Sequence, residues 1–144
     1  MSKAYLILDD GTKFEGLTFG ADIKTVDKSN KVETVFFTGM TGFQEMLTDP
    51  KYRGKIVVST FPIAGSAGVN DEDVISNDPN DSPVGYIVRE YCDKPSNFRA
   101  RGTIDEFMKK RGIVGLYGID TRRLTRILRD KGHTKGFISE ICEN

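Results

Sequence analysis

The sequence predicts an α/β domain of layered architecture with a mixed sheet. Strand-like segments fill the first half of the chain, and helical patterns alternate with further strand-like segments in the second half. Such a mixture is typical of layered α/β or α+β folds. With 144 residues, 38% of them hydrophobic, the chain is long enough for one domain with its own core. We therefore expect residues 1–144 to form a single domain.

The first predicted elements are the two strands of a β-hairpin. The runs Ala4 to Leu8 and Lys13 to Phe19 flank the dipeptide Asp10-Gly11, and glycine tolerates the positive φ of a tight turn. Later runs of β-branched and aromatic residues are typical of strands. These are Val32 to Phe37, Ile56 to Val58, Val84 to Val88, Ile113 to Leu116 and Gly136 to Ile141.

Helical patterns occur in three places. Thr41 and Gln44 have the spacing of a capping box, in which each side chain pairs with a backbone N–H at the helix start. Pro50 prevents this short helix from continuing. A second helix is expected from Thr103, where the capping spacing recurs, to Gly112.

The third predicted helix is strongly basic on its outer surface. Asp120 is its expected N-cap and Gly132 its expected C-terminal stop. Cationic residues recur from Arg122 to Lys131, and binding of a phosphate or nucleic acid is one interpretation. The formal net charge of +0 and the absence of interleaved aromatic residues favour instead a solvated or partner-facing surface.

Composition excludes several classes of function. No apolar run approaches the roughly 20 residues that cross a bilayer, and the N-terminus lacks the pattern of a secretory signal, so we expect a cytoplasmic protein. His133 is the single histidine, and Cys92 and Cys142 form no paired motif, which argues against a disulfide framework or a zinc site. A Cys92–His133 dyad remains an alternative, although the acidic neighbours of Cys92 would raise the pKa of its thiol.

The long polar region Gly65 to Pro83 is the predicted interaction loop, because long loops in compact domains are usually functional or mobile. Its run Asp71-Glu72-Asp73 offers carboxylates to a cation but has no EF-hand spacing, so we interpret it as a solvated acidic turn or a helix start. Gly65-Ser66-Ala67-Gly68 lacks the ending of a phosphate-binding loop. We expect no metal site and no cofactor in this chain.

Six segments share the order and spacing of one protein family. They are Leu8-Asp9-Asp10-Gly11-Thr12, Thr38-Gly39-Met40-Thr41-Gly42-Phe43-Gln44-Glu45, Leu47-Thr48-Asp49-Pro50, Val69-Asn70-Asp71-Glu72-Asp73, Pro95-Ser96-Asn97-Phe98-Arg99 and Gly118-Ile119-Asp120-Thr121-Arg122 with Leu124-Thr125. As a set they resemble the amino-terminal domain of the small subunit of glutamine-dependent carbamoyl phosphate synthetase. The resemblance covers nearly the whole chain.

The resemblance implies a layered β/β/α fold of the swivelling-domain type. It also implies a following class I glutamine amidotransferase domain, whose nucleophilic cysteine lies in a Gly-x-Cys-x-Gly elbow. No such elbow occurs here, so the chain alone is expected to be inactive. Ammonia from glutamine would pass to a large subunit that holds ATP, Mg and bicarbonate. The enzyme would serve pyrimidine synthesis, arginine synthesis or both.

The resemblance also implies site residues. The expected motif and interface residues are Thr41, Gly42, Gln44, Glu45, Asp49, Pro50, Asn70, Asp71, Asp120 and Arg122. Lys51 occupies a position that contacts glutamine in the family and usually holds a serine. A hydroxyl contact is lost there, whereas a backbone contact can survive. The Pro50-Lys51 corner is therefore expected to face the neighbouring catalytic domain.

Two functions of other classes remain as alternatives. The first is a free-standing module that binds an anion or nucleic acid through the helix Arg122 to Lys131, with binding that survives only at low salt. The second is a small enzyme that depends on Cys92, whose activity would disappear on Cys92→Ser.

Overall fold

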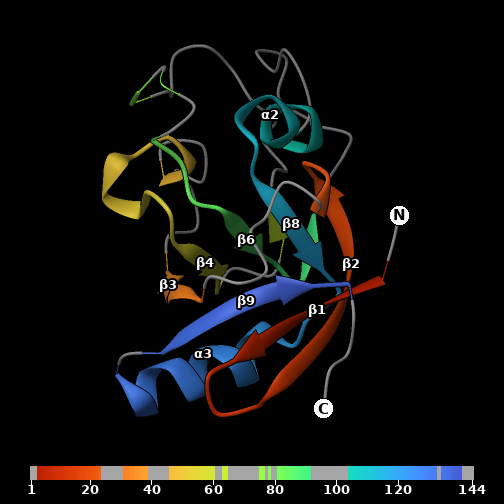
Figure 1. Cartoon of the computed structure of the whole chain (residues 1–144), viewed down its shortest axis with the longest axis vertical. Coiled ribbons are helices and arrows are strands. Elements are labelled where there is room, and N and C mark those ends of the chain that lie inside the picture. The colour runs from red at the N-terminus through yellow and green to blue at the C-terminus, as the bar shows by residue number, and fades with distance from the viewer. Residues whose placement is uncertain are drawn as a thin grey trace.

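The computed structural model describes residues 3–23, 31–38, 46–60, 63–64, 75–76, 78, 81–91, 104–132 and 134–140 (Figure 1). Its strands are β1 (Lys3–Leu8), β2 (Lys13–Gly20), β3 (Val32–Phe37), β4 (Ile56–Ser59), β5 (Ile63–Ala64), β6 (Gly85–Ile87), β7 (Glu90–Tyr91), β8 (Val114–Tyr117) and β9 (Lys135–Ser139). Its helical elements are the 3-10 turn η2 (Pro50–Tyr52) and the helices α2 (Ile104–Arg111) and α3 (Thr121–Lys131). The predicted strands and the two later predicted helices are confirmed within the described residues. The expected helix start at Thr103 and strand end at Ile141 lie outside them.

The opening hairpin forms around the predicted Asp-Gly turn. Gly11 has a φ of 89°, a conformation that glycine adopts without steric cost. The backbone N–H of Leu8 donates to the carbonyl of Thr12 at 2.9 Å, and β1 and β2 then pair antiparallel. This local turn chemistry therefore sets the register of the first two strands.

Seven of the described strands close into a barrel in the order β1-β2-β8-β6-β4-β3-β9. The neighbours β3, β4, β6 and β8 pair in parallel, whereas β1, β2 and β9 join them through antiparallel pairs. The predicted α/β class and mixed sheet are confirmed. The finer β/β/α layering remains a prediction, since closure of the barrel does not establish it.

A separate two-stranded sheet lies outside the barrel. β5 and β7 pair in parallel, with Ile63 opposite Glu90 and Ala64 opposite Tyr91. The sequence did not predict either strand, because a run of two residues is too short to show alternation. In the described part of the chain, no helix is long and apolar enough to span a membrane.

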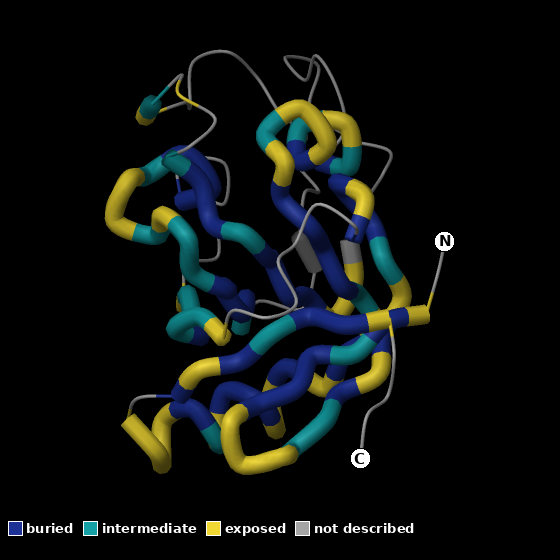
Figure 2. Tube along the Cα trace, in the orientation of Figure 1, coloured by how far each residue is buried: buried dark blue, intermediate teal, exposed yellow. Residues whose placement is uncertain are grey.

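The parallel strands β4, β6 and β8 are buried on both faces, whereas most residues of β3 are half-buried. Ile56 and Val58 of β4 pack in one cluster with Leu124 and Leu128 of α3. Val57, between them in the sequence, packs in a second cluster with residues of α2. Figure 2 shows β4, β6 and β8 mainly in the buried class, between the exposed surfaces of the two helices. Near-continuous hydrophobic runs are what a strand buried on both faces requires.

α3 is capped at both ends as predicted. The Asp120 carboxylate accepts from the backbone N–H of Arg123 at 3.1 Å, and Gly132 ends the helix with a φ of 77°. The last helical residue, Lys131, forms an ion pair with Asp10 at the hairpin turn. This ion pair joins two segments far apart in sequence and fixes the helix C-terminus against the barrel.

Asp10→Asn is expected to reduce stability near neutral pH and to have less effect in acid. The hydrogen bond from Lys131, followed by those from Thr12, holds the pKa of Asp10 well below its usual range. A lowered native pKa stabilises the fold above the unfolded-state pKa of about 3.9 and ceases to do so as pH falls. Urea unfolding of both proteins from pH 7 down to pH 2 measures the difference.

The same series in a Lys131→Met background is the control. Because Lys131 is the largest cause of the shift in the Asp10 pKa, the pH-dependent part of the difference should shrink in that background. A difference between the two proteins that stays constant from pH 7 to pH 2 contradicts the role given to this ion pair.

Candidate functional site

A tight corner connects the buried residues Met46 and Leu47 to β4, and its geometry follows from the sequence Asp49-Pro50-Lys51. Asp49 has the extended backbone that a following proline imposes, and it is the N-cap of η2. Its carboxylate accepts from the backbone N–H of Lys51 at 3.0 Å. The backbone N–H of Tyr52 donates to the carbonyl of Asp49 at 3.0 Å. The predicted proline turn is therefore confirmed and forms a 3-10 turn.

The corner rests on a buried apolar base. Met46 and Leu47 are helical and pack in the second core cluster with Tyr86 of β6. The ring of Tyr52 meets that of Phe37 edge-on, with centroids 6.5 Å apart. Burial raises the pKa of Tyr86 to about 12, against a smaller opposing effect of its hydrogen bond with Ser59. Tyr86 is thus neutral near pH 7 and supports the corner without exchanging protons.

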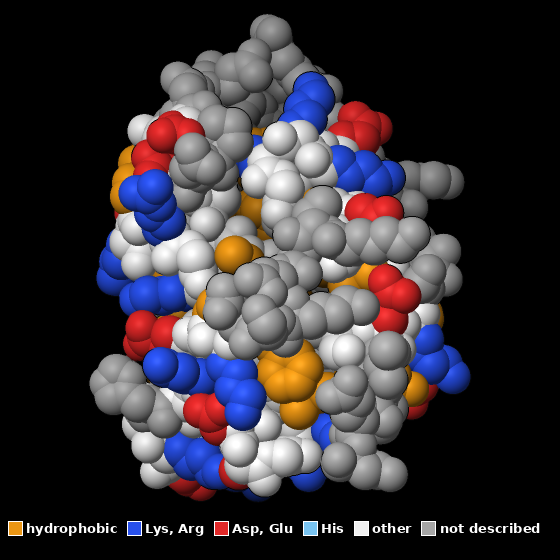
Figure 3. All heavy atoms as spheres, viewed as in Figure 1, with side chains coloured by type: hydrophobic (Ala, Val, Ile, Leu, Met, Phe, Trp, Pro, Cys, Tyr) orange, Lys and Arg blue, Asp and Glu red, His pale blue; other side chains and the backbone are white. Residues whose placement is uncertain are grey.

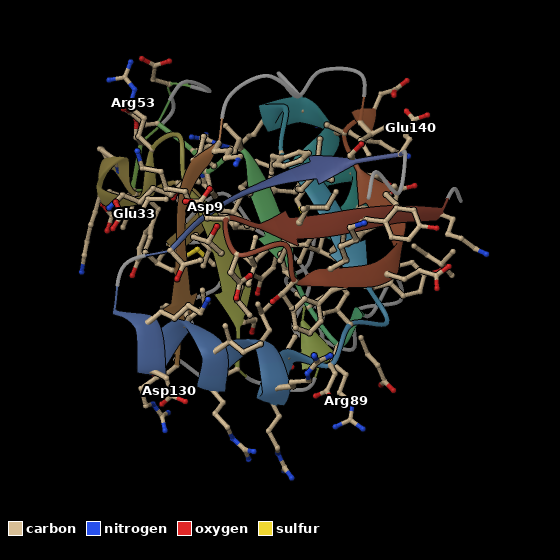
Figure 4. The ribbon with its side chains drawn as sticks, turned by 60° about the horizontal axis from the view of Figure 1, so that its bottom comes forward. Asp9, Glu33, Arg53, Arg89, Asp130 and Glu140 are labelled. Carbon is tan, nitrogen blue, oxygen red and sulfur yellow. The ribbon has the colours of Figure 1, made fainter. Side chains whose placement is uncertain are left out.

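The outer side of the corner carries two exposed cations, Lys51 and Arg53. The Lys51 ammonium lies 5.5 Å from the centroid of the Tyr52 ring, a distance at which a cation–π contact holds it over the ring. A guanidinium nitrogen of Arg53 lies 4.0 Å from the carboxylate of Asp81. Figure 4 shows Arg53 at the periphery, and charges of both signs are interspersed along this edge in Figure 3. The corner offers polar contacts to a neighbour.

The segment that contains Ile75 is hydrogen-bonded to Thr48, just before the corner. The hydroxyl of this buried residue accepts from the backbone N–H of Ile75 at 2.9 Å. Ile75 itself is 55% exposed, one of two large hydrophobic residues exposed among the described ones. An exposed apolar residue is therefore hydrogen-bonded through its backbone to Thr48, next to the corner in sequence.

Arg111, the last residue of α2, forms hydrogen bonds with residues that follow Ile75 in the chain. Its guanidinium donates to the Ser82 hydroxyl at 2.7 Å and to the carbonyls of Ser76 at 2.9 Å and Asp78 at 2.8 Å. A longer bond of 3.4 Å reaches the Asp81 carbonyl. Burial lowers the pKa of Arg111, while the carboxylates of Asp81 and Asp78 oppose that shift. Arg111 is the residue of this site that the sequence did not reveal.

The structure separates the predicted site residues that it describes into two groups. Asp49, Pro50 and Lys51 form the corner, whereas Asp120 and Arg122 begin α3. Figures 1 and 4 both place the corner at one edge of the molecule and α3 on another side. The remaining predicted residues lie outside the described part of the chain. These are Thr41, Gly42, Gln44, Glu45, Asn70 and Asp71, together with Cys92, His133 and Cys142.

The described groups of the corner are suited to binding a neighbouring protein or substrate. The polar ones are two exposed cations, a capping carboxylate and backbone groups committed to the turn. Among the residues that the structure describes, no group of three His, Cys, Asp or Glu side chains is placed to hold a metal ion. An ordered turn above an apolar base can position a neighbouring protein or substrate without itself supplying a nucleophile.

Known proteins similar to this chain share one description. The family model described as carbamoyl-phosphate synthase small chain, CPSase domain, matches residues 6–138. The carbamoyl phosphate synthase small chain of Fusobacterium nucleatum subsp. nucleatum is 49% identical over 144 residues, which are 100% of this chain and 38% of that protein. That of Bacillus caldolyticus is 48% identical over 136 residues, covering 94% of this chain and 35% of that protein.

A third relative agrees with the first two. The carbamoyl phosphate synthase small chain of Listeria monocytogenes serotype 4b is 45% identical over 144 residues, covering 100% of this chain and 38% of that protein. The chain thus spans little more than a third of the length of these curated relatives.

Proposed function

This chain belongs to the carbamoyl-phosphate synthase small chain family, and from that premise we propose that it is the noncatalytic amino-terminal domain of a glutamine-dependent small subunit. In this role it docks to the large subunit and flanks the glutaminase site that supplies ammonia for carbamoyl phosphate. The observation that supports the proposal is the ordered Asp49-Pro50-Lys51 corner above its buried base, because the resemblance implies that the Lys51 position faces glutamine. It is a positioning element.

The proposal divides the chemistry among three parts. The glutaminase domain that follows in the full-length subunit releases ammonia, and the large subunit uses ATP, Mg and bicarbonate. This chain holds no cofactor and acts in the cytoplasm, in pyrimidine synthesis, arginine synthesis or both. The burial of β4 on both faces supports the finer β/β/α layering proposed for the domain.

The proposal is tested by mixing the chain with the large subunit of a relative such as the Fusobacterium enzyme. Size-exclusion chromatography should show a complex that contains both polypeptides. In a separate assay, the chain incubated with glutamine should release no ammonia above the buffer rate. A chain that stays apart from the large subunit, or one that hydrolyses glutamine by itself, overturns the proposal.

Lys51→Ser is expected to lower the KM for glutamine in an enzyme in which this chain replaces the matching segment of a relative's small chain. The serine would supply the hydroxyl contact usual in the family, and one additional hydrogen bond of about 0.5–1.5 kcal/mol corresponds to roughly 2- to 12-fold in KM. The readout is glutamine-dependent carbamoyl phosphate synthesis at varied glutamine.

Lys51→Ala is the matched control, since it removes the lysine without adding a hydroxyl. It should leave the KM for glutamine well above that of Lys51→Ser. Equal KM values in the two variants would show that this position makes no hydroxyl contact with glutamine. Thermal unfolding of each variant separates a local effect on binding from a loss of folded protein.

A further inference from the structure

The basic surface of α3 contains residues with two different roles. Arg123 lies over the ring of Phe14, 5.2 Å from its centroid, and Lys131 pairs with Asp10. Both therefore contribute to the attachment of the helix to the hairpin. Three further arginines remain, and we call Arg122, Arg126 and Arg129 the α3 arginine stripe. All three are exposed, and within the described part of the chain none is placed in an ion pair.

Helix stability does not account for the α3 arginine stripe. Its members are spaced by four and three residues, so they lie on one face of the helix, where like charges repel. Arg122 stands in the first turn, which contains no acidic residue, and a cation there opposes the helix dipole. Arg129 lies in the last turn, where a cation suits the helix dipole. The penalty therefore falls on Arg122 and on the repulsion along the stripe, which an external anionic partner would relieve.

The fold fixes the side of α3 that carries the arginine stripe so that it faces solvent. On the other side of the helix, Leu124, Thr125 and Leu128 are buried, and both ends are capped. Arg89 extends the basic surface beyond the helix start, because its carbonyl accepts from the backbone N–H of Gly118 at 2.9 Å, close to the Asp120 cap. Figure 4 shows Arg89 pointing outward on the side that carries α3.

We propose that the α3 arginine stripe docks against an acidic surface of the carbamoyl phosphate synthase large subunit. This inference rests on the proposed function and names the surface that would perform the docking. Guanidinium groups suit carboxylates because they pair with them in bidentate geometry. α3 carries no aromatic residue on which bases could stack, and the formal net charge of +0 provides no overall attraction to nucleic acid.

The position of the stripe gives the domain two interaction surfaces. The Asp49-Pro50-Lys51 corner and α3 lie on different sides of the barrel in both ribbon views (Figures 1 and 4). The corner would face the glutaminase site while the stripe faces the large subunit. A rigid barrel between them would then fix the position of one neighbour relative to the other.

The test compares two triple variants that lose the same charge. Arg122→Gln, Arg126→Gln and Arg129→Gln neutralise the stripe, and glutamine has nearly the helix propensity of arginine. Lys13→Gln, Lys110→Gln and Lys135→Gln neutralise three lysines on β2, α2 and β9. Binding of the whole chain to the large subunit is measured by biolayer interferometry from 50 to 300 mM NaCl. Circular dichroism establishes that each variant is folded.

Neutralising the stripe should weaken binding roughly tenfold at 50 mM NaCl, as expected for three exposed charge pairs, and should flatten the salt dependence. The control variant should bind within about twofold of the unmodified chain. If the unmodified chain binds and both variants match it, the stripe is not the docking surface, and the inference fails while the proposed function stands. If the unmodified chain does not bind, both fail.

A fluorescent single-stranded DNA provides the nucleic-acid arm of the experiment. The unmodified chain should show no binding to it at 150 mM NaCl. DNA binding at that salt that the stripe variant loses and the lysine control retains would assign the stripe to nucleic acid, and would overturn the proposal that its partner is a protein.

Discussion

Gly20→Ala is expected to destabilise the fold by about 2–5 kcal/mol. This loss is the sum of a backbone strain term and an overpacking term. Gly20 has a φ of 75°, and a side chain in that conformation costs about 1–2 kcal/mol. A Cβ atom there would also lie 2.6 Å from the carbonyl oxygen of Ile113 and 3.0 Å from Cβ of Met108, and such overpacking costs about 1–3 kcal/mol. Urea unfolding at pH 7 measures the loss.

Gly112→Ala separates the two penalties. Gly112 has a φ of 71°, but a Cβ atom added to it would meet nothing within 4 Å, so the variant should lose only about 1–2 kcal/mol. The close approach at Gly20 lies where β2 meets α2, since the backbone N–H of Gly20 also donates to the Asp105 carboxylate at 2.7 Å. Equal losses of stability in Gly20→Ala and Gly112→Ala would mean that a side chain at Gly20 does not clash with Ile113 and Met108.

Arg111→Met should cost about 2–3 kcal/mol and release the segment around Ser76 and Ser82. The substitution keeps much of the aliphatic chain but removes the donors to the Ser82 hydroxyl and to the carbonyls of Ser76 and Asp78. Bonds to a charged donor are each worth about 1.5–3 kcal/mol, and grouped bonds are not additive. Hydrogen exchange at the backbone amides of Ile75 and Asp81 should accelerate.

Lys110→Met is the control for Arg111→Met. Lys110 is exposed on the same helix and makes none of these bonds, so its replacement should change stability by less than about 0.5 kcal/mol. Exchange at Ile75 that stays unchanged in Arg111→Met would show that the hydroxyl of Thr48 holds the segment without help from α2.

Features controlled by nearby residues could be predicted from the sequence. The Asp10-Gly11 turn, the Asp120 cap, the Gly132 stop and the proline corner each depend on residues a few positions apart, and each occurs where predicted. The short helix expected after Thr41 is seen only at Met46 and Leu47, because its start lies outside the described residues. Local chemistry therefore predicts the elements of the fold well.

Features that depend on distant pairs could not be predicted. The barrel closes because β9 pairs with both β1 and β3, and no property of the last strand indicates either partner. Arg111 follows two lysines at the end of α2, where any cation suits the helix dipole, yet its bonding partners lie about 30 residues earlier in the sequence. Spacing along a sequence carries no information about such contacts.

The central claim is that this chain positions the glutaminase and large-subunit partners of a carbamoyl phosphate synthase. The most direct measurement uses a Fusobacterium small chain in which this chain replaces the matching 144-residue segment, assembled with its large subunit. The hybrid should restore glutamine-dependent carbamoyl phosphate synthesis, relative to a small chain lacking the segment. A hybrid that is folded and yet no more active than the shortened chain would contradict it.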